Sequence, residues 1–151
     1  MIKAEDLRIG DLVRVNKNDS IKNGLIGKVT DIDSLREYKE KKGAITLNTI
    51  EDDGWYWGIW CCNIEGIPLT PELLEKNGFE ILRSGACYAK PIGPQKKYTS
   101  RYISIENMQT EWKVFLKYAS LTDHVLLRSV NYVHELQHIL WALGTDANLK
   151  I

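Results

Sequence analysis

The stretch 55–79 constrains the fold of this chain most, because a strand, a short helix and a second strand can all be placed within it. Thr70 is suited to cap a helix, since its hydroxyl can accept a backbone N–H of the first turn. Pro71 would occupy the first helical position, where its missing donor is not needed and its fixed φ suits a helix. Gly78 can adopt the left-handed conformation that ends a helix. We therefore predict a helix over 71–77, which at about two turns needs packing to be stable.

Three tryptophans and a tyrosine crowd the strand predicted before this helix: Trp55, Tyr56, Trp57 and Trp60. Strict alternation would place Trp55, Trp57, Ile59 and Cys61 on one face and Tyr56, Gly58, Trp60 and Cys62 on the other. One interpretation is an exposed aromatic platform for a base, a peptide or a methylated cation. The other, more common for aromatic residues in strands, is that one face fills a core while the other packs against the second module. No Lys or Arg lies within 44–74, which disfavours a nucleic-acid groove here.

The first third of the chain predicts short, bent strands. Residues 9–15 read I-G-D-L-V-R-V, and residues 24–32 read G-L-I-G-K-V-T-D-I. This pattern is similar to the opening of small SH3-like barrels, including the KOW type, in which glycines relieve crowding where the strands curl. Residues 34–42 are charged and polar, which indicates a solvated loop or a frayed helical turn. Residues 44–50 alternate as a strand does, and an Asp-Gly pair favours a hairpin turn into the aromatic strand.

The second half of the chain predicts a sheet followed by a helix. Strands are expected over 86–89, 98–106 and 111–118, with a proline-containing loop at 91–94 and either a strand or the approach to a helix at 125–130. A helix over 131–143 would begin at an Asn131 cap and end at Gly144. We thus predict an α+β fold: a small SH3-like β-barrel module over 1–66, then a module over 67–151 in which the C-terminal helix packs on a short antiparallel sheet.

Charge and cysteine content narrow the function classes. The formal net charge is zero, yet segment 83–128 holds 8 Lys and Arg against 3 Asp and Glu. This basic segment, with Lys96, Lys97 and Arg101 as candidate contacts, indicates either a surface for an acidic partner or an ordinary solvated sheet face. The three cysteines fit no disulfide framework, so we expect reduced thiols. No apolar run is long enough to span a membrane, and no signal peptide is recognised, so we expect a cytoplasmic protein with no membrane partner.

The sequence H-E-L-Q-H at residues 134–138 matches the H-E-x-x-H pattern of zinc peptidases. On a helix, His134 and His138 would project from one face and could bind zinc, with Glu135 as general base for the metal-bound water. No third ligand falls at a recognised spacing, however, and the histidines lie opposite the predicted apolar stripe. We therefore expect surface histidines, no catalytic residue and no cofactor, with zinc binding as the alternative.

Three segments resemble one family. They are L-R-I-G-D-L-V at 7–13, I-P-L-T-P-E-L-L with a following G-F at 67–79, and V-H-E-L-Q with a following A-L at 133–143. The chain resembles a family of small uncharacterised proteins of gut Bacteroidetes and of their phages and mobile elements. The family has no established activity, so the resemblance implies no catalytic residue. The family often has Gln at the position of Glu135 and Asn at that of His138, which implies that the zinc-peptidase pattern is coincidental.

Three functions follow from these observations. The first is a non-enzymatic cytoplasmic interaction protein, encoded by a phage or mobile element, with a protein partner bound by the aromatic strand and the basic segment. The second is nucleic-acid binding through a KOW-like barrel and segment 83–128. The third is a minimal zinc peptidase built on His134, Glu135 and His138.

Overall fold

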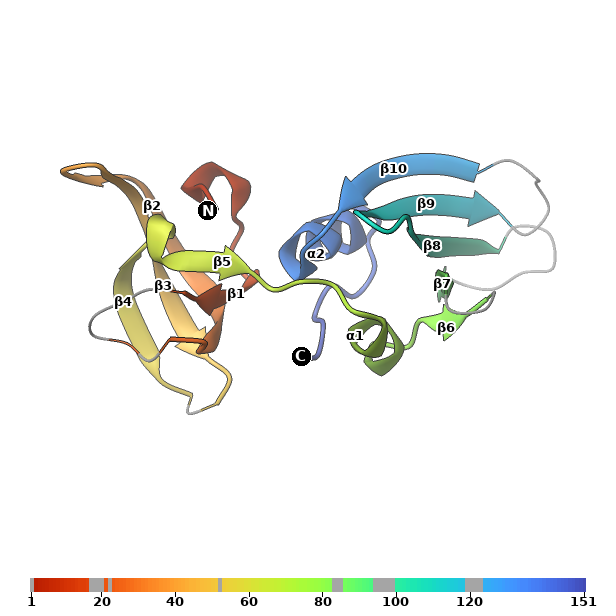
Figure 1. Cartoon of the computed structure of the whole chain (residues 1–151), viewed down its shortest axis with the longest axis horizontal. Coiled ribbons are helices and arrows are strands. Elements are labelled where there is room, and N and C mark those ends of the chain that lie inside the picture. Colours follow the sequence, from red (N-terminus) through yellow and green to blue (C-terminus); the bar gives the residue numbers. More distant parts are fainter. Residues whose placement is uncertain are drawn as a thin grey trace. The chain divides into compact units, whose positions relative to one another are not determined.

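The computed structural model shows a mostly β chain that divides into two compact units, Met1–Ile67 and Pro68–Ile151 (Figure 1). It describes residues 2–16, 21, 23–51, 53–82, 86–93, 100–118 and 124–151. The boundary predicted from the sequence, after residue 66, lies one residue before this division. Among the described residues, no helix is long and apolar enough to cross a membrane.

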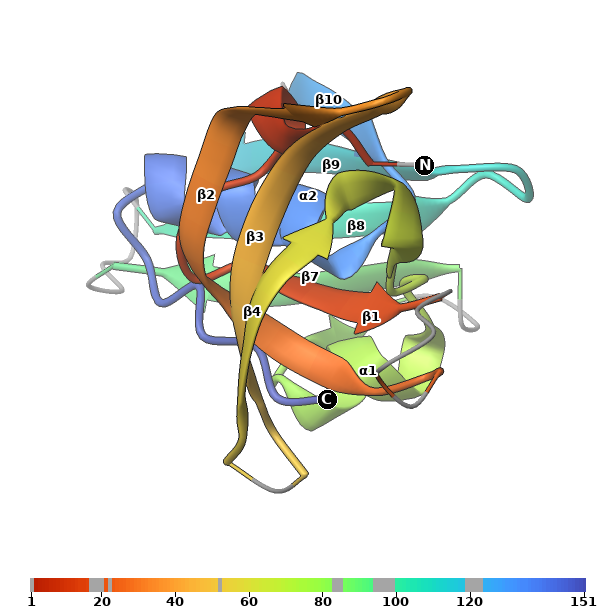
Figure 2. The same cartoon turned by 90° about the vertical axis from the view of Figure 1, so that its left-hand side faces the viewer.

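The first unit is a five-stranded antiparallel sheet in the order β4-β3-β2-β1-β5. Its strands are β1 (Leu12–Val15), β2 (Ile26–Tyr38), β3 (Lys41–Thr49), β4 (Trp55–Trp60) and β5 (Ile64–Gly66), with short 3-10 turns at Ala4–Asp6 and Cys61–Asn63. Figure 2 shows how strongly β2 and β3 bend. Within the part of the chain that the structure describes, no ladder joins β4 to β5, so the sheet does not close into a barrel.

A hydrophobic core fills one side of this sheet. Its buried members come from every strand and from the N-terminal segment: Ile2, Leu7, Val13, Val15, Leu25, Val29, Ile45, Leu47, Ile59, Cys61 and Ile64. The side of the sheet opposite this cluster is called the outer face below.

The prediction of a loop or helical turn over 34–42 is wrong. β2 runs on to Tyr38, turns at residues 39–40 and returns as β3, with Glu37 opposite Lys42 and Tyr38 opposite Lys41. Every residue of 34–42 is exposed. A strand with both faces in solvent buries neither, so it shows no apolar alternation from which it could be recognised.

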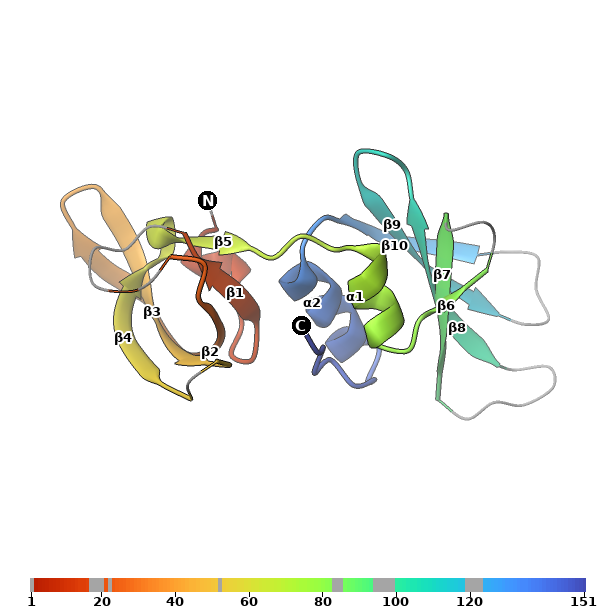
Figure 3. The ribbon, with the colours of Figure 1, turned by 60° about the horizontal axis from the view of Figure 1, so that its bottom comes forward.

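The second unit is an antiparallel sheet in the order β10-β9-β8-β7-β6 with two helices. The strands are β6 (Glu80–Ile81), β7 (Cys87–Ile92), β8 (Arg101–Asn107), β9 (Trp112–Tyr118) and β10 (His124–Val130), and the helices are α1 (Pro71–Lys76) and α2 (Val133–Ala142). Figure 3 shows both helices on the same side of this sheet. A backbone hydrogen bond of 2.9 Å from Leu69 N to Asn131 O ties the approach to α1 to the start of α2.

Local signals predicted α1 correctly. Thr70 caps the helix, with its hydroxyl accepting the N–H of Leu73 at 3.3 Å, and Pro71 is the first helical residue. Asn77 is the C-cap, and Gly78 follows with φ of +77°. Each of these interactions lies within about two turns, which is why sequence alone could place them.

Two predictions in the second unit need correction. Pro91 lies in β7, opposite Tyr102, and not in a loop. β6 pairs with β7 only at Tyr88 and Ala89, so the proline sits where β7 has no neighbour on that side and no second donor is required. The helix predicted over 131–143 forms, but its N-cap is Tyr132 and not Asn131. Residues 125–130 lie in β10. The sequence had allowed either a strand or a segment leading into the helix there.

Candidate functional site

A β-bulge sets the direction of the aromatic side chains of β4. Ile45 of β3 is opposite Ile59, but Leu47, two residues further, is opposite Tyr56, three residues away. The extra residue is accommodated at Gly58, whose φ is +65°. Tyr56 and Ile59 therefore both face the core, and the strict alternation predicted for this strand is wrong.

Trp55, Trp57 and Trp60 lie on the outer face as a result, and they are called the tryptophan face below. Trp55 and Trp57 are 55% and 76% exposed, and their rings stack at 6.1 Å between centroids. The interpretation of these two residues as core is wrong. Tyr56, which was predicted with them as a contact residue, is instead half-buried and packs against the core.

The β2–β3 hairpin adds a second stack around Trp60. Tyr38 stacks on Trp60 at 6.5 Å between centroids, and the Arg36 guanidinium lies 5.2 Å from the Trp60 ring centroid. A Cβ on Gly58 would lie 2.7 Å from Arg36 Nη1, so the glycine also leaves room for the guanidinium. The sequence held no signal for this stack, because residues 36 and 38 were expected in a loop.

Two carboxylates share the outer face with the tryptophans. Asp33 is opposite Ala44, which is itself opposite Trp60, and Asp31 is opposite Thr46. Paired residues in adjacent strands point to the same face of a sheet. Both aspartates are exposed, and neither forms an ion pair with another residue that the structure describes. The face therefore combines open aromatic rings, two exposed carboxylates and the Arg36 guanidinium.

One cation, Arg36, lies on this face over Trp60, and two lysines lie near it. Lys42 is 3.6 Å from Glu37 in an exposed ion pair. Lys28 is opposite Asn48, the residue opposite Trp55, and so belongs to the outer face, where its Cε lies 3.7 Å from the place of a Cβ on Gly10. None of these three cations forms an ion pair with Asp31 or Asp33 in the part of the chain that the structure describes.

The basic segment 83–128 is only partly described. The candidate contacts Lys96 and Lys97 lie outside the described residues, and Arg101 is exposed at the start of β8. Most other basic side chains described there have acidic or carbonyl partners: Lys90 with Asn77 O at 2.9 Å, Lys113 with Glu111 at 3.8 Å, Lys117 with Glu106 at 2.8 Å and Arg128 with Glu135 at 3.9 Å. The described cations thus form no continuous unpaired strip for a nucleic-acid backbone.

The H-E-x-x-H segment lies on α2, but not as predicted. His134 is only 4% exposed and His138 is half-buried, so the expectation of solvent-facing histidines is wrong. The Tyr132 ring stacks on His134 at 5.8 Å between centroids and covers one face of the imidazole. No group of three His, Cys, Asp or Glu that could hold a metal ion occurs within the described ranges.

Glu135 has a structural role at the start of α2. Its Oε2 accepts hydrogen bonds from the backbone N–H groups of Asn131 at 2.7 Å and Tyr132 at 3.1 Å. Because a helix start leaves such N–H groups without helical partners, this carboxylate satisfies two of them. The glutamate that the motif would use as a base is thus engaged in capping.

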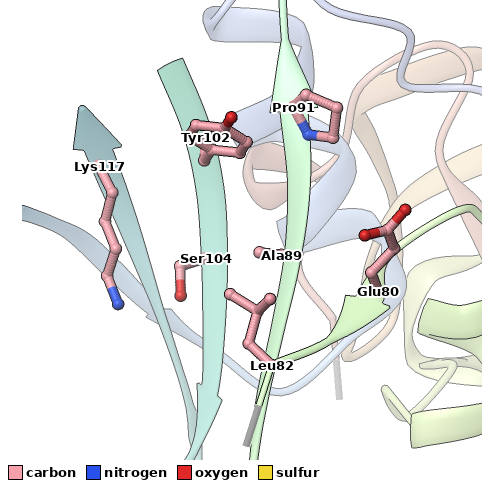
Figure 4. Close-up of a pocket in the computed structure, with 7 residues that line it drawn as sticks. All are labelled: Glu80, Leu82, Ala89, Pro91, Tyr102, Ser104 and Lys117. Carbon is pink, nitrogen blue, oxygen red and sulfur yellow. The ribbon is translucent and has the colours of Figure 1, made fainter. Parts of the chain in front are cut away.

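Sequence reasoning missed a groove on the sheet of the second unit. It has a volume of about 300 Å³ and is lined by Glu80, Leu82, Ala89, Pro91, Tyr102, Ser104 and Lys117 (Figure 4). Lys90 reaches the C-cap of α1, so the alternating neighbours Ala89 and Pro91 point away from the helices. The groove is mostly apolar, and Lys117, the cation among its described lining residues, is held 2.8 Å from Glu106. Ser104 of its lining hydrogen-bonds with the Cys87 thiol at 3.2 Å, and that thiol lies 3.9 Å from Glu106 Oε1.

We compared the chain with protein-family models, with curated proteins and with solved structures. None matches it.

Proposed function

We propose that this protein is a non-enzymatic cytoplasmic interaction protein that binds a partner protein through the tryptophan face. The observation that carries the proposal is the exposure of Trp55 and Trp57 side by side on a sheet whose other face already holds the core. Contiguous exposed aromatic surface marks interaction sites in soluble proteins, and tryptophan is enriched among residues that dominate binding energy.

The backbone of β4 supports the proposal. Simple alternation would have turned Ile59 to the same face as Trp57, whereas the bulge at Gly58 buries Ile59 and leaves the rings outside. The exposure of the tryptophans therefore follows from a specific backbone feature of β4.

The fold and the cysteines support the finer parts of the proposal. The strand order, in which β1 pairs with both β2 and β5 and β2 to β4 form a meander, favours an SH3-like arrangement of the first unit. Cys61, Cys62 and Cys87 are free thiols, as expected of a protein in a reducing compartment. Encoding by a phage or mobile element remains part of the proposal, on the resemblance given above.

Nucleic-acid binding is the alternative that one observation favours, since stacked tryptophans can also stack on bases. Asp31 and Asp33 on the same face oppose it, because they would repel a phosphate backbone. A protein partner is the better fit.

Affinity capture from cells that encode the chain tests the proposal. The full chain, the double variant Trp55→Ser/Trp57→Ser and the control Trp141→Ser are immobilised; Trp141 is 68% exposed on α2 and lies outside the tryptophan face. We expect a discrete partner that the wild type and the control both retain and the double variant loses. Recovery of the same proteins on all three baits would contradict the proposal.

A further inference from the structure

We infer that the tryptophan face binds an arginine-bearing segment of the partner protein. This inference rests on the function proposed above and adds the chemistry of the partner. The guanidinium would lie against the exposed rings of Trp55 and Trp57, and Asp31 and Asp33 would neutralise its charge. Four observations carry the inference: the exposed carboxylates of the outer face, the existing contact between Arg36 and Trp60, the exposure of the Trp55 and Trp57 rings, and the spacing of the strands that bear them.

Two exposed carboxylates on the outer face, which have no ion pair with the described residues, favour a cation. Asp31 and Asp33 are exposed, and only β3 separates them from β4. Adjacent strands lie about 4.8 Å apart, so the backbones of β2 and β4 are roughly 10 Å apart and a single long side chain can reach across. A third carboxylate, that of Asp53, accepts a hydrogen bond of 3.0 Å from Asn48, the residue opposite Trp55.

The chain itself contains the contact that we propose. Arg36 lies over the Trp60 ring at 5.2 Å, and Tyr38 stacks on the same ring. The same face therefore already holds a guanidinium against a tryptophan. Cation–π attraction of this kind is strongest for tryptophan.

Trp55 and Trp57 are the rings still open to a ligand. Across the part of the chain that the structure describes, the cations that lie over rings contact Trp60, Tyr38, Phe79 and Phe115. Trp57 is also the more exposed of the pair, at 76%. An incoming guanidinium would repeat the contact of Arg36 on the neighbouring ring pair.

Arginine fits this face better than lysine or a nucleic acid. The guanidinium is planar, can stack on an aromatic ring while its N–H groups meet a carboxylate, and is less strongly hydrated than an ammonium. Lysine has the positive charge, but its ammonium group is not planar and cannot stack on a ring. A nucleic acid offers the plane of a base, but its phosphates would approach Asp31 and Asp33.

Peptide binding to the full chain tests the inference. The probes are acetylated Gly-Arg-Gly-Arg-Gly-Arg-Gly amide, the same peptide with lysine, the same peptide with citrulline, which keeps the shape and lacks the charge, and an eight-nucleotide oligothymidylate. Binding is measured by titration calorimetry and by quenching of tryptophan fluorescence, at low and at moderate salt. The variants are Trp57→Ala, Asp31→Asn/Asp33→Asn and the control Trp141→Ala, each checked for folding by circular dichroism.

We expect the arginine peptide to bind, the citrulline peptide to bind at least about tenfold more weakly, and the lysine peptide to fall between them. Trp57→Ala and the double aspartate variant should each weaken arginine-peptide binding by about tenfold, whereas Trp141→Ala should leave it unchanged. Equal binding of the arginine and citrulline peptides, tighter binding of oligothymidylate, or no arginine-peptide binding up to about 1 mM would overturn the inference.

The two experiments fail separately. A captured partner that depends on Trp55 and Trp57, together with no response to the arginine peptide, would overturn the arginine inference and leave the interaction function standing. If the capture experiment yields no protein whose binding depends on Trp55 and Trp57, the proposed function itself is overturned.

Discussion

Tyr88 makes the stability of the second unit vary with pH in the alkaline range. The residue is 2% exposed, and burial raises its pKa, with a smaller contribution from the charges of Glu75 and Glu72. The folded state therefore holds the phenolic proton more tightly than the unfolded state, whose tyrosine pKa is about 10. The contribution of Tyr88 to the free energy of unfolding is therefore fully present below about pH 10, the pKa in the unfolded state. It is lost as the pH rises through the raised pKa of the folded state.

Tyr88→Phe should remove this pH dependence while keeping the ring, which contacts Trp112 edge-on at 5.9 Å. We expect the free energy of unfolding of the wild type to fall more steeply between pH 9 and 11 than that of the variant, as measured by urea unfolding. The other tyrosines are the same in both proteins and serve as the internal control. Identical slopes would show that burial of this phenol does not affect its ionisation.

Glu135 is the residue for which the structure changes the interpretation most. Glu135→Ala removes the acceptor of two backbone N–H groups at the start of α2 and should lower the free energy of unfolding by about 1–2 kcal/mol. Glu135→Gln keeps a side-chain oxygen and should lose less. Urea unfolding of both variants measures the difference; an alanine variant as stable as the wild type would rule out the capping role.

At the scale of elements, the bulge in β4 and the hairpin β2–β3 act together. Gly58 has φ of +65°, and the three atoms nearest to a Cβ there belong to the Arg36 guanidinium. Gly24 has φ of +87° and nothing within 4 Å of the added carbon, so it is a matched control for backbone strain alone.

Gly58→Ala and Gly24→Ala should therefore lose similar stability, about 1 kcal/mol each, through the strained backbone. Only Gly58→Ala should move the Arg36 guanidinium off Trp60, because Arg36 must shift to admit the methyl group. NMR ring-current shifts of the Arg36 side chain would detect the movement. Unchanged Arg36 shifts in Gly58→Ala would show that the guanidinium does not use the space left by the glycine.

Two side chains at the end of α1 hold the C-terminal segment: Lys76 Nζ donates to Ile151 O at 2.6 Å, and Asn77 makes the larger number of hydrogen bonds. Asn77 Nδ2 donates to Leu73 O at 2.8 Å and to Lys150 O at 2.9 Å, and its Oδ1 accepts from Lys150 N at 2.7 Å. The same segment buries Leu149 and receives a hydrogen bond from Gln137 of α2 at Ala147 O. Lys76 and Asn77 thus link a helix end to the last residues of the chain.

Asn77→Ala should lower the free energy of unfolding by about 2 kcal/mol and speed amide exchange at Lys150, because all three hydrogen bonds are lost. Asn77→Asp keeps the acceptor for Lys150 N and should protect that amide better than alanine does. Asn148→Ala is the control, since Asn148 donates its backbone and side-chain N–H groups to Asp146 Oδ1. Exchange at Lys150 that is equally slow in all variants would contradict this role of Asn77.

At the scale of the whole molecule, each unit has a hydrophobic core of its own. The cluster of the first unit lies within residues 2–64, and the second unit buries a separate set on its own sheet and helices. A unit with its own core can fold alone. We expect the fragments 1–67 and 68–151 to give NMR spectra that overlay on those of the full chain. A fragment that is unfolded by itself would show that its stability depends on the other unit.

What the sequence determined by itself is the structure that depends on neighbours along the chain. The cap at Thr70, Pro71 at the first helical position and the stop at Gly78 defined α1, and strict alternation defined β9, because each signal spans only a few residues. The α2 helix was recognisable for the same reason, although its N-cap was misplaced by one residue.

Only the tertiary structure decided which surfaces are open. The register of β4 against β3 turned Trp55 and Trp57 outward, and packing around α2 covered His134. The hairpin that brings Arg36 and Tyr38 to Trp60 shows no apolar pattern in the sequence. Strand register and packing bring together residues that are distant in the chain, and a local pattern of side chains does not identify those distant partners.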